Sequence, residues 1–313
     1  MRRVWPMQKA PQTADDVASK LSGRLLVLVA AVLWSTNGFF GDAPIFKGYW
    51  DDDIRGIMLA FWRAVFASLA LVPMVRRPSW SPWLIPSSLI FVVMNVTFLN
   101  AMAYGGPTTA IWLQNTAPGW VFLIGVFVFR ERVVPRDWLL LLFCVLGVGF
   151  ILLFGLQETK SAKGVIWGVF GGLTYAAVVL SLRQLRGHDA IWLIALNLLV
   201  TAVALSPFVV LHSVEHGDWP HGWQWLYLAA FGMLQMGIPY VLFARGLQRI
   251  AGHEASGITL LEPILVPVWV FLAWHNSPLY ESPKWWIFVG GGLILIGLLV
   301  RYFGIARRQV ESK

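Results

Sequence analysis

Long apolar stretches run through this sequence almost from end to end. Ten of them reach about 18 residues or more, the length that an α-helix needs to cross a bilayer. Their approximate bounds are 24–45, 56–75, 83–104, 108–129, 137–154, 164–182, 190–211, 223–244, 254–275 and 285–304. Hydrophobic residues make up 58% of the 313 residues and charged residues only 13%, a balance typical of membrane proteins. We therefore expect an all-α integral membrane protein with ten transmembrane helices.

The distribution of basic residues predicts the orientation of these helices, because cytoplasmic loops are enriched in Lys and Arg. With the N-terminus inside, 18 of the 24 basic residues fall in inner segments and five in outer segments, while Arg63 alone lies within a span. Both termini are then cytoplasmic, with residues 1–23 and 305–313 as tails, and the membrane is the cytoplasmic (inner) membrane. The formal net charge of +8 thus reflects topology, and we expect this chain to meet the lipid bilayer and no nucleic acid.

The two halves of the chain, residues 24–154 and 164–304, contain a faint internal repeat. At an offset of 145 residues the matches are Phe98 with Phe243, Ala110 with Ala255, Pro118 with Pro263, Phe143 with Phe288, and Gly147 with Gly292. Each half holds five spans, an odd number, so the second half must enter the membrane from the opposite side. Inverted five-helix repeats are characteristic of secondary transporters, whose substrate site lies between the repeats near mid-membrane.

Four motifs carry a resemblance to a known family: "LWSTNGFF", "FWRAVFASLAL", "AIWLQNTAPGWVFLIGVFVFRERV" and "LLEPILVPVWVFLAW". In their order and spacing the chain resembles the EamA-type permeases of the drug/metabolite transporter superfamily over residues 24 to 304. The resemblance implies a central cavity lined by helices one to four and six to nine, and export or exchange of amino acids and other small metabolites. The chain departs from the family pattern at Ser35, and it lacks the acidic residue that ends the ninth helix. The first-half counterpart of that residue, Glu131, is therefore given no transport role by analogy.

Two charged residues lie deep within apolar stretches. Glu262 is the one deep carboxylate and Arg63 the one deep cation, and ionisable residues at such positions are functional candidates. They can neutralise each other and join two helices. Alternatively, Glu262 exchanges protons during a transport cycle, or Arg63 holds the carboxylate and Glu262 the ammonium group of a zwitterionic amino acid.

Uncharged polar and aromatic residues in the spans are candidates to complete a substrate pocket, since pockets combine apolar walls with a few placed polar groups. The candidates are Trp34, Asn37, Asn100, Tyr104, Gln114, Tyr175, Gln235 and Tyr240, together with Asn95, Asn115 and Asn197. Hydrogen bonding between helices is the alternative role for each of the polar residues.

Glycine and proline predict how the helices pack and bend. Gly164, Gly168 and Gly172 recur every fourth residue, a spacing that allows a neighbouring helix to approach closely. Pro118, Pro263 and Pro267 remove helix hydrogen bonds and predict bends, which are either static or part of a rocking motion. The acidic run from Asp51 to Asp53 is expected to cap the second helix.

The remaining features limit the function. Cys144 is the only cysteine, so disulfides and cysteine metal sites are not expected, and there is no glycine-rich phosphate loop to bind ATP. We expect no cofactor and no metal, apart from coupling to protons or another ion. A membrane-embedded enzyme is disfavoured because the spans hold no acid pair. The sequence favours a secondary transporter of small metabolites that works by alternating access, with a channel or scaffold as the alternative.

Overall fold

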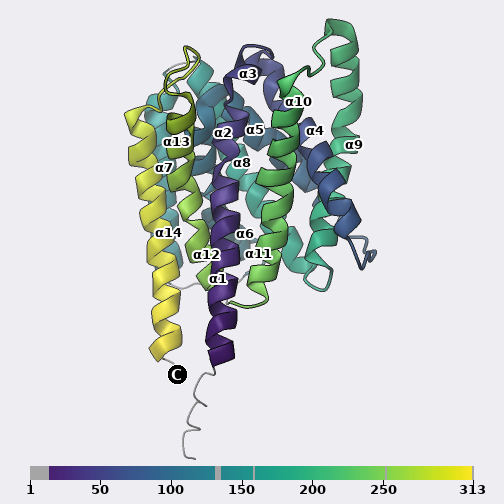
Figure 1. The fold of residues 1–313 in the computed structure, drawn as a ribbon. Coiled ribbons are helices and arrows are strands. Elements are labelled where there is room, and N and C mark those ends of the chain that lie inside the picture. The colour runs from purple at the N-terminus through teal and green to yellow at the C-terminus, as the bar shows by residue number, and fades with distance from the viewer. Residues whose placement is uncertain (1–13, 131–134, 158, 251, 312–313) are drawn as a thin grey trace, which may run out of the picture.

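The computed structural model describes residues 14–130, 135–157, 159–250 and 252–311, and these residues contain helices and connections but no strand. The helices of the first half are α1 (Ala14–Ser35), α2 (Asn37–Gly41), α3 (Pro44–Lys47), α4 (Asp52–Leu71), the 3₁₀ turn η1 (Val72–Met74), α5 (Leu84–Gln114), α6 (Ala117–Phe127) and α7 (Pro135–Gly155). Those of the second half are α8 (Thr159–Gln184), α9 (Ala190–His216), α10 (Trp223–Ala230), the π-helix η2 (Phe231–Gly237), α11 (Ile238–Leu247), α12 (Gly252–Thr259), α13 (Leu261–Trp274) and α14 (Trp285–Glu311). Most of them run roughly parallel to one axis as a bundle (Figure 1).

The described part of the chain contains eight helical segments that are long and apolar enough to cross a membrane. Two shorter apolar helices, Ala117–Phe127 and Trp285–Arg301, occupy the positions of the fourth and tenth predicted spans. Many apolar side chains face outward, including Leu153, Val203 and Leu211, which are 64 to 70% exposed. Such an exterior suits contact with lipid, and the crossing count of ten stays a prediction.

The predicted third and fourth spans are joined in α5, which bends sharply at Gly106. This residue has φ 79° and ψ 162°, a backbone conformation that glycine adopts readily. Pro107 follows and cannot donate a backbone hydrogen bond to the preceding turn. The bend therefore lies between the third and fourth predicted spans, at residues 105–107.

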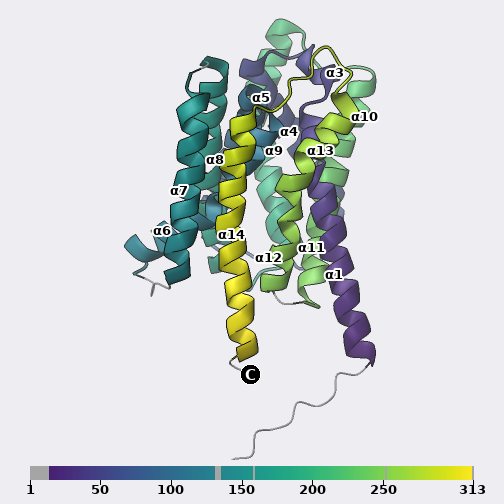
Figure 2. The same ribbon diagram turned by 90° about the vertical axis from the view of Figure 1, so that its left-hand side faces the viewer.

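The first residues of α1 and the last residues of α14 lie at the same end of the bundle, which we call the proximal end (Figures 1 and 2). The opposite end is called the distal end. α1 runs from the proximal to the distal end, whereas α8 follows α7 at the distal end and runs back. α1 packs against α11 and α13, while α8 packs against α5 and α6, so the two helices make corresponding contacts in the two halves.

Two of the predicted spans are broken at equivalent positions. Between α5 and α6 the helix is interrupted at Asn115 and Thr116, and between α12 and α13 it is interrupted at Leu260. Pro118 and Pro263 lie in the first turn of the helix that follows each break, where the missing N–H group costs little. The predicted bends at these prolines are confirmed, whereas Pro267 lies inside α13 without a break.

The glycine stripe of α8 lies directly against α5. A β-carbon added to Gly164 would lie 2.3 Å from Gly105 Cα, and one added to Gly168 would lie 2.5 Å from Leu113 Cδ1. One added to Gly172 would lie 2.6 Å from the Leu113 carbonyl oxygen. The predicted close approach is confirmed, because only glycine leaves room for the neighbouring helix at these positions.

Some expectations about helix ends need correction or lie beyond the described residues. Asp51 precedes α4 but makes no side-chain capping hydrogen bond, so the predicted cap is wrong in that respect. Asp52 and Asp53 do lie in the first turn, where negative charge suits the helix dipole. α1 already begins at Ala14, so part of the expected N-terminal tail is helical. Glu131 lies outside the described residues.

Candidate functional site

A cavity of about 530 Å³ lies between the two halves of the bundle; we call it the central cavity. Helices α1, α2, α4, α5 and α6 contribute lining residues from the first half, and α8, η2 and α11 to α14 contribute them from the second. The volume falls within the range of about 300 to 1,000 Å³ that is usual for small-molecule sites. The cavity is thus large enough for a metabolite.

Arg63 reaches the central cavity from α4 and is held by partners on two other helices. The residue is 3% exposed, its Nη2 donates a hydrogen bond to Asn95 Oδ1 of α5, and its guanidinium lies 5.1 Å from the ring centre of Phe231 in η2. Asn95 is itself oriented, because its Nδ2 donates to the Phe91 carbonyl at 3.0 Å. Within the described residues, Arg63 Nε is buried and has no hydrogen-bond partner. A planar guanidinium with a free donor can bind a carboxylate through directed hydrogen bonds.

Glu262 enters the central cavity from the first turn of α13, just after the break in the ninth predicted span. Asn37 Nδ2 of α2 donates a hydrogen bond to Glu262 Oε1 at 3.3 Å. The N-terminus of a helix also favours a negative charge, because its first N–H groups lack partners within the helix. Ala117 occupies the equivalent position at the start of α6, so the carboxylate belongs to one repeat only.

An aromatic wall completes this side of the central cavity. The Trp34 ring lies 5.1 Å from the ring centres of both Tyr240 and Phe243. Gln235, within the π-helix η2, donates from Nε2 to the Trp34 carbonyl at 3.2 Å, where α1 ends. Among the described residues, Gln235 Oε1 and Asn37 Oδ1 are buried without a hydrogen-bond donor. Both residues line the central cavity, and Asn37 contacts Glu262 directly through its Nδ2.

Most of the site residues predicted from sequence line the central cavity. These are Trp34, Asn37, Arg63, Gln114, Tyr175, Gln235, Tyr240 and Glu262, and Asn115 joins them. Asn100 is buried where α4 and α5 meet, and a β-carbon added to Gly56 would lie 2.1 Å from its Oδ1. Tyr104 lies at the distal end, where its hydroxyl donates a hydrogen bond to Asp53. Neither residue lines the central cavity, and Tyr104 instead lines a second cavity at the distal end.

The two deep charges share the central cavity, but no ion pair joins Arg63 to Glu262 in the described part of the chain. Each is held by an asparagine side chain instead. Asn197 also has a structural partner, since its Oδ1 accepts a hydrogen bond from Ser88 at 2.8 Å between α9 and α5.

Several lining residues were not predicted from sequence. Ser256 and Thr259 precede Glu262 at intervals of three, a spacing that places side chains on one helix face and could have indicated them. Arg301 lines the cavity 16 residues into α14, about 24 Å along the helix axis from its distal start. It also lies 3.2 Å from Asp137 Oδ1. The cavity therefore extends toward the proximal end.

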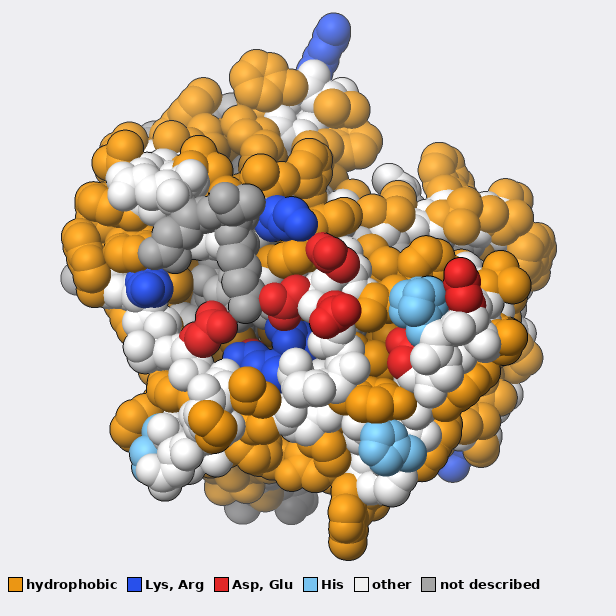
Figure 3. All heavy atoms as spheres, turned by 90° about the horizontal axis from the view of Figure 1, so that it is seen from above, with side chains coloured by type: hydrophobic (Ala, Val, Ile, Leu, Met, Phe, Trp, Pro, Cys, Tyr) orange, Lys and Arg blue, Asp and Glu red, His pale blue; other side chains and the backbone are white. Residues whose placement is uncertain are grey.

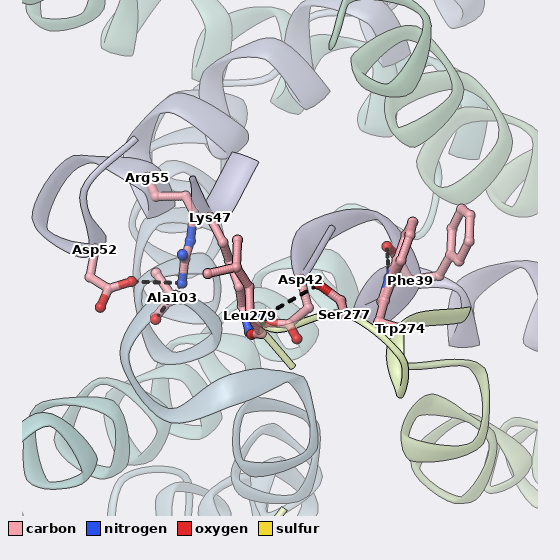
Figure 4. Close-up of polar contacts among 9 residues, drawn as sticks. All are labelled: Phe39, Asp42, Lys47, Asp52, Arg55, Ala103, Trp274, Ser277 and Leu279. Carbon is pink, nitrogen blue, oxygen red and sulfur yellow. Dashed lines mark hydrogen bonds and ion pairs between the residues drawn. The ribbon is translucent and has the colours of Figure 1, made fainter. Parts of the chain in front are cut away.

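Aromatic side chains join α2 to the second half of the chain. Phe39 stacks on Trp274 with ring centres 5.2 Å apart, and Phe40 stacks on Phe231 at 5.6 Å. Trp274 Nε1 also donates to the Phe39 carbonyl at 3.0 Å, a contact drawn in Figure 4.

Charged side chains are also buried at the distal end, apart from the two deep charges predicted from sequence. Arg55 and Asp42 are each 3% exposed, and the Lys47 side chain is 12% exposed. The sequence places these residues in outer segments or at a helix end. The bend of α5 and the segment 275–284 contribute to the cavity wall around them and thereby cover them.

Comparison with known proteins agrees with this architecture. The sequence matches the EamA-like transporter family over residues 21–153 and 162–303. An uncharacterized transporter, YxxF, of Bacillus subtilis (strain 168) is 24% identical over 277 residues, which cover 84% of each chain. An uncharacterized transporter of Archaeoglobus fulgidus is 23% identical over 283 residues, which cover 90% of this chain and 96% of the relative. A solved crystal structure shares the fold, with a TM-score of 0.59 and 18% identity over 92% of this chain and 99% of the other.

The family match extends over both halves that enclose the central cavity, and both relatives are described as transporters. This multi-pass membrane protein is therefore a transporter, and the chain belongs to the EamA-like transporter family.

Proposed function

We propose that this transporter is a secondary active carrier of a small zwitterionic metabolite, an amino acid or a related compound, and that it works by alternating access. The observation that carries the proposal is the separation of two charges, the buried Arg63 and the half-buried Glu262. Arg63 and Glu262 line one cavity without forming an ion pair with each other in the described structure. Charges inside a membrane protein that are not paired with each other require another partner, and a zwitterion supplies one for each.

The groups around each charge suit the two ends of such a substrate. The free Nε of Arg63 is a donor for the substrate carboxylate. Asn37, which contacts Glu262, and Gln235, which lines the same cavity, each have a buried oxygen without a described donor and supply acceptors for an ammonium group. The aromatic wall at Trp34 contributes apolar surface for the remainder of the molecule.

The proposed architecture has ten spans arranged as two inverted five-helix repeats, 24–154 and 164–304, in the cytoplasmic membrane. The opposite directions of α1 and α8 and the equivalent breaks before α6 and α13 support it. With the basic proximal end in the cytoplasm, the central cavity extends toward the cytoplasm through Arg301. A substrate would enter this conformation from inside the cell, as export or exchange requires.

Glu262 is the proposed coupling residue. It lines the substrate cavity, and its described hydrogen-bond partner is the neutral Asn37 rather than a cation. A carboxyl group in that position can bind either a proton or the substrate ammonium group, and competition between them would couple the two movements.

A transport screen in proteoliposomes tests these proposals. The purified chain is reconstituted and offered the protein amino acids and related metabolites, with and without a pH gradient. We expect saturable flux of one or more zwitterions that increases with the gradient. Glu262→Gln should lose the response to the gradient, and Arg63→Gln should lose affinity for substrates that carry a carboxylate.

Matched control variants make the same substitutions at exposed residues outside the cavity. Glu215→Gln and Arg186→Gln change exposed side chains and should transport like the parent. If Glu262→Gln keeps the pH response of the parent, the coupling role is wrong. Flux that never saturates and persists in Glu262→Gln would identify a channel, and a covalently changed product in the vesicles would identify an enzyme.

A further inference from the structure

A second cavity, of about 410 Å³, lies at the distal end of the bundle; we call it the distal chamber. Its lining includes the charged residues Asp42, Lys47, Arg55, Glu281 and Lys284. Figure 3 looks onto this end and shows Lys and Arg side chains in a hollow with acidic side chains around its rim. The chamber shares none of its lining residues with the central cavity, so it is a separate space.

The charges of the distal chamber are held by a small network, which Figure 4 shows in close-up. Lys47 Nζ lies 2.8 Å from Asp42 Oδ1 and donates to the Leu279 carbonyl at 3.3 Å. Arg55 Nη2 lies 2.8 Å from Asp52 Oδ1. Asp42 and Arg55 are almost fully buried, and charged side chains are seldom buried without a specific partner or role.

One contact of Arg55 has a structural explanation, and one of its donors has none. Arg55 Nη2 donates to the Ala103 carbonyl at 2.6 Å. That carbonyl lacks its usual helix partner because the residue four positions later is Pro107, which has no N–H group. Arg55 Nε, by contrast, is buried without a hydrogen-bond partner in the described structure. The hydrogen-bonding capacity of this guanidinium is therefore not fully satisfied by the described residues.

The distal chamber repeats the chemistry of the central cavity. Each contains a guanidinium from α4, and Arg55 precedes Arg63 by eight residues, about 12 Å along the helix. Each also contains a carboxylate next to α2, since Asp42 follows this helix and Glu262 is bonded to its first residue. Both cavities therefore offer a cation and an anion to one molecule.

A thin partition separates the two spaces. A β-carbon added to Gly38 would lie 2.6 Å from Val270 Cγ2 and 2.9 Å from Pro107 Cβ, so α2 packs directly against α13 and the bend of α5. Val270 and Pro107 line the distal chamber, whereas Asn37, the neighbour of Gly38, lines the central cavity. A displacement of α2 would connect the two cavities.

Neutral hydrogen-bonding groups complete the distal chamber. Thr108, Thr109, Ser161 and Ser282 contribute hydroxyl groups to its lining. Burial, with a smaller contribution from the Asp42 carboxylate, raises the pKa of Tyr280, so its hydroxyl remains a donor. Hydroxyl donors next to cations are typical of sites that bind a carboxylate.

We propose that the distal chamber is a second binding site for the transported zwitterion, with Arg55 and Lys47 holding its carboxylate and Asp42 its ammonium group. The substrate occupies the central cavity and the distal chamber in succession as it crosses the membrane. This inference rests on the proposed function, because it takes the same substrate class.

The test is a count of bound ligands by native mass spectrometry of the full chain in lipid nanodiscs. The probes are the twenty protein amino acids, titrated one at a time. Three forms are compared: the parent, Glu262→Gln for the central cavity, and the double variant Asp42→Asn with Lys47→Met for the distal chamber. The double variant removes both partners of the ion pair together, so that no charge is left unpaired.

We expect two bound molecules per parent chain for at least one amino acid, and one in each variant. A parent that binds one molecule, lost in Glu262→Gln and kept in the double variant, overturns the distal site and leaves the proposed function standing. One molecule that is kept in Glu262→Gln and lost in the double variant overturns the central site instead. Two molecules that persist in the double variant overturn the distal site, and no binding of any probe overturns both.

A second variant covers the case in which the double variant does not fold. Tyr280→Phe with Glu281→Gln changes the same chamber from the segment that connects α13 to α14. Binding of the second molecule should weaken at least tenfold, while the first is unaffected. Equal affinities for both molecules in this variant and the parent would overturn the distal site.

Discussion

Replacing Gly164 by alanine should push α8 away from the bend of α5. The β-carbon of the alanine would lie 2.3 Å from Gly105 Cα and 2.4 Å from Gly105 N. Both obstacles are backbone atoms, so no side chain can rotate away to make room. The two helices must separate instead, and the neighbouring contact at Gly168 on α8 would be loosened with them.

The geometry sets the size of the effect. Ordinary van der Waals contact begins at 3.4 Å, so the β-carbon is 1.1 Å too close to Gly105 Cα. A gap of about 1 Å forfeits roughly half of the dispersion energy of each atom pair that it separates. Overpacking of this kind costs about 1 to 3 kcal/mol. We expect the free energy of unfolding to fall by an amount in this range.

The assay is thermal unfolding of the purified protein in detergent, followed by tryptophan fluorescence. Gly149→Ala is the matched control, because no neighbouring atom among the described residues lies within 4 Å of the added β-carbon. Alanine is favoured over glycine within a helix by about 1 kcal/mol, so the control should be as stable as the parent or more stable. If Gly164→Ala unfolds at the same temperature as Gly149→Ala, the close packing of α8 on α5 is refuted.

Three further predictions concern buried polar groups. Asp42→Asn leaves Lys47 unpaired and should lower the free energy of unfolding by about 3 to 5 kcal/mol, while adding Lys47→Met should restore part of it. If the single and double variants unfold at the same temperature, the ion pair is contradicted. Asn95→Leu removes the hydrogen-bond acceptor of Arg63 and should lower the free energy of unfolding by about 1 to 3 kcal/mol in the same assay. An unchanged unfolding temperature would show that this hydrogen bond is not formed. Cys144 is 4% exposed, so a maleimide dye should label it only after unfolding. Rapid labelling of the native protein would show that Cys144 is not buried between helices.

The main outline of the central cavity could be predicted because its chemistry stands out along the chain. A charge within a long apolar stretch is visible without any knowledge of its neighbours, and Arg63 and Glu262 were identified in this way. The glycine stripe of α8 and the prolines at the two helix breaks were also predictable. A proline removes a hydrogen bond of its own helix, and small residues at every fourth position form a stripe on one helix face, so both features can be read from a single segment.

The distal chamber could not be predicted, because its charged residues do not stand out within an apolar stretch. Asp42, Lys47 and Arg55 lie near the ends of apolar stretches, where charged residues are ordinarily exposed. Their burial depends on the bend of α5 and on the segment 275–284, which are distant in sequence. Asn100 shows the same limit, because only the packing of α4 on α5 turns it toward Gly56 and away from the cavity.

The sequence by itself determined the membrane setting, the apolar helices and the equivalent breaks in the two repeats, because hydrophobic length and missing N–H groups act on each segment alone. Only the tertiary structure decided which polar groups share a cavity. It also decided that Arg63 and Glu262 do not pair directly, since Asn95 on α5 holds the guanidinium and Asn37 on α2 holds the carboxylate. Those contacts join helices that are far apart in the chain, so their geometry exists only after α2, α4, α5 and α13 have packed together.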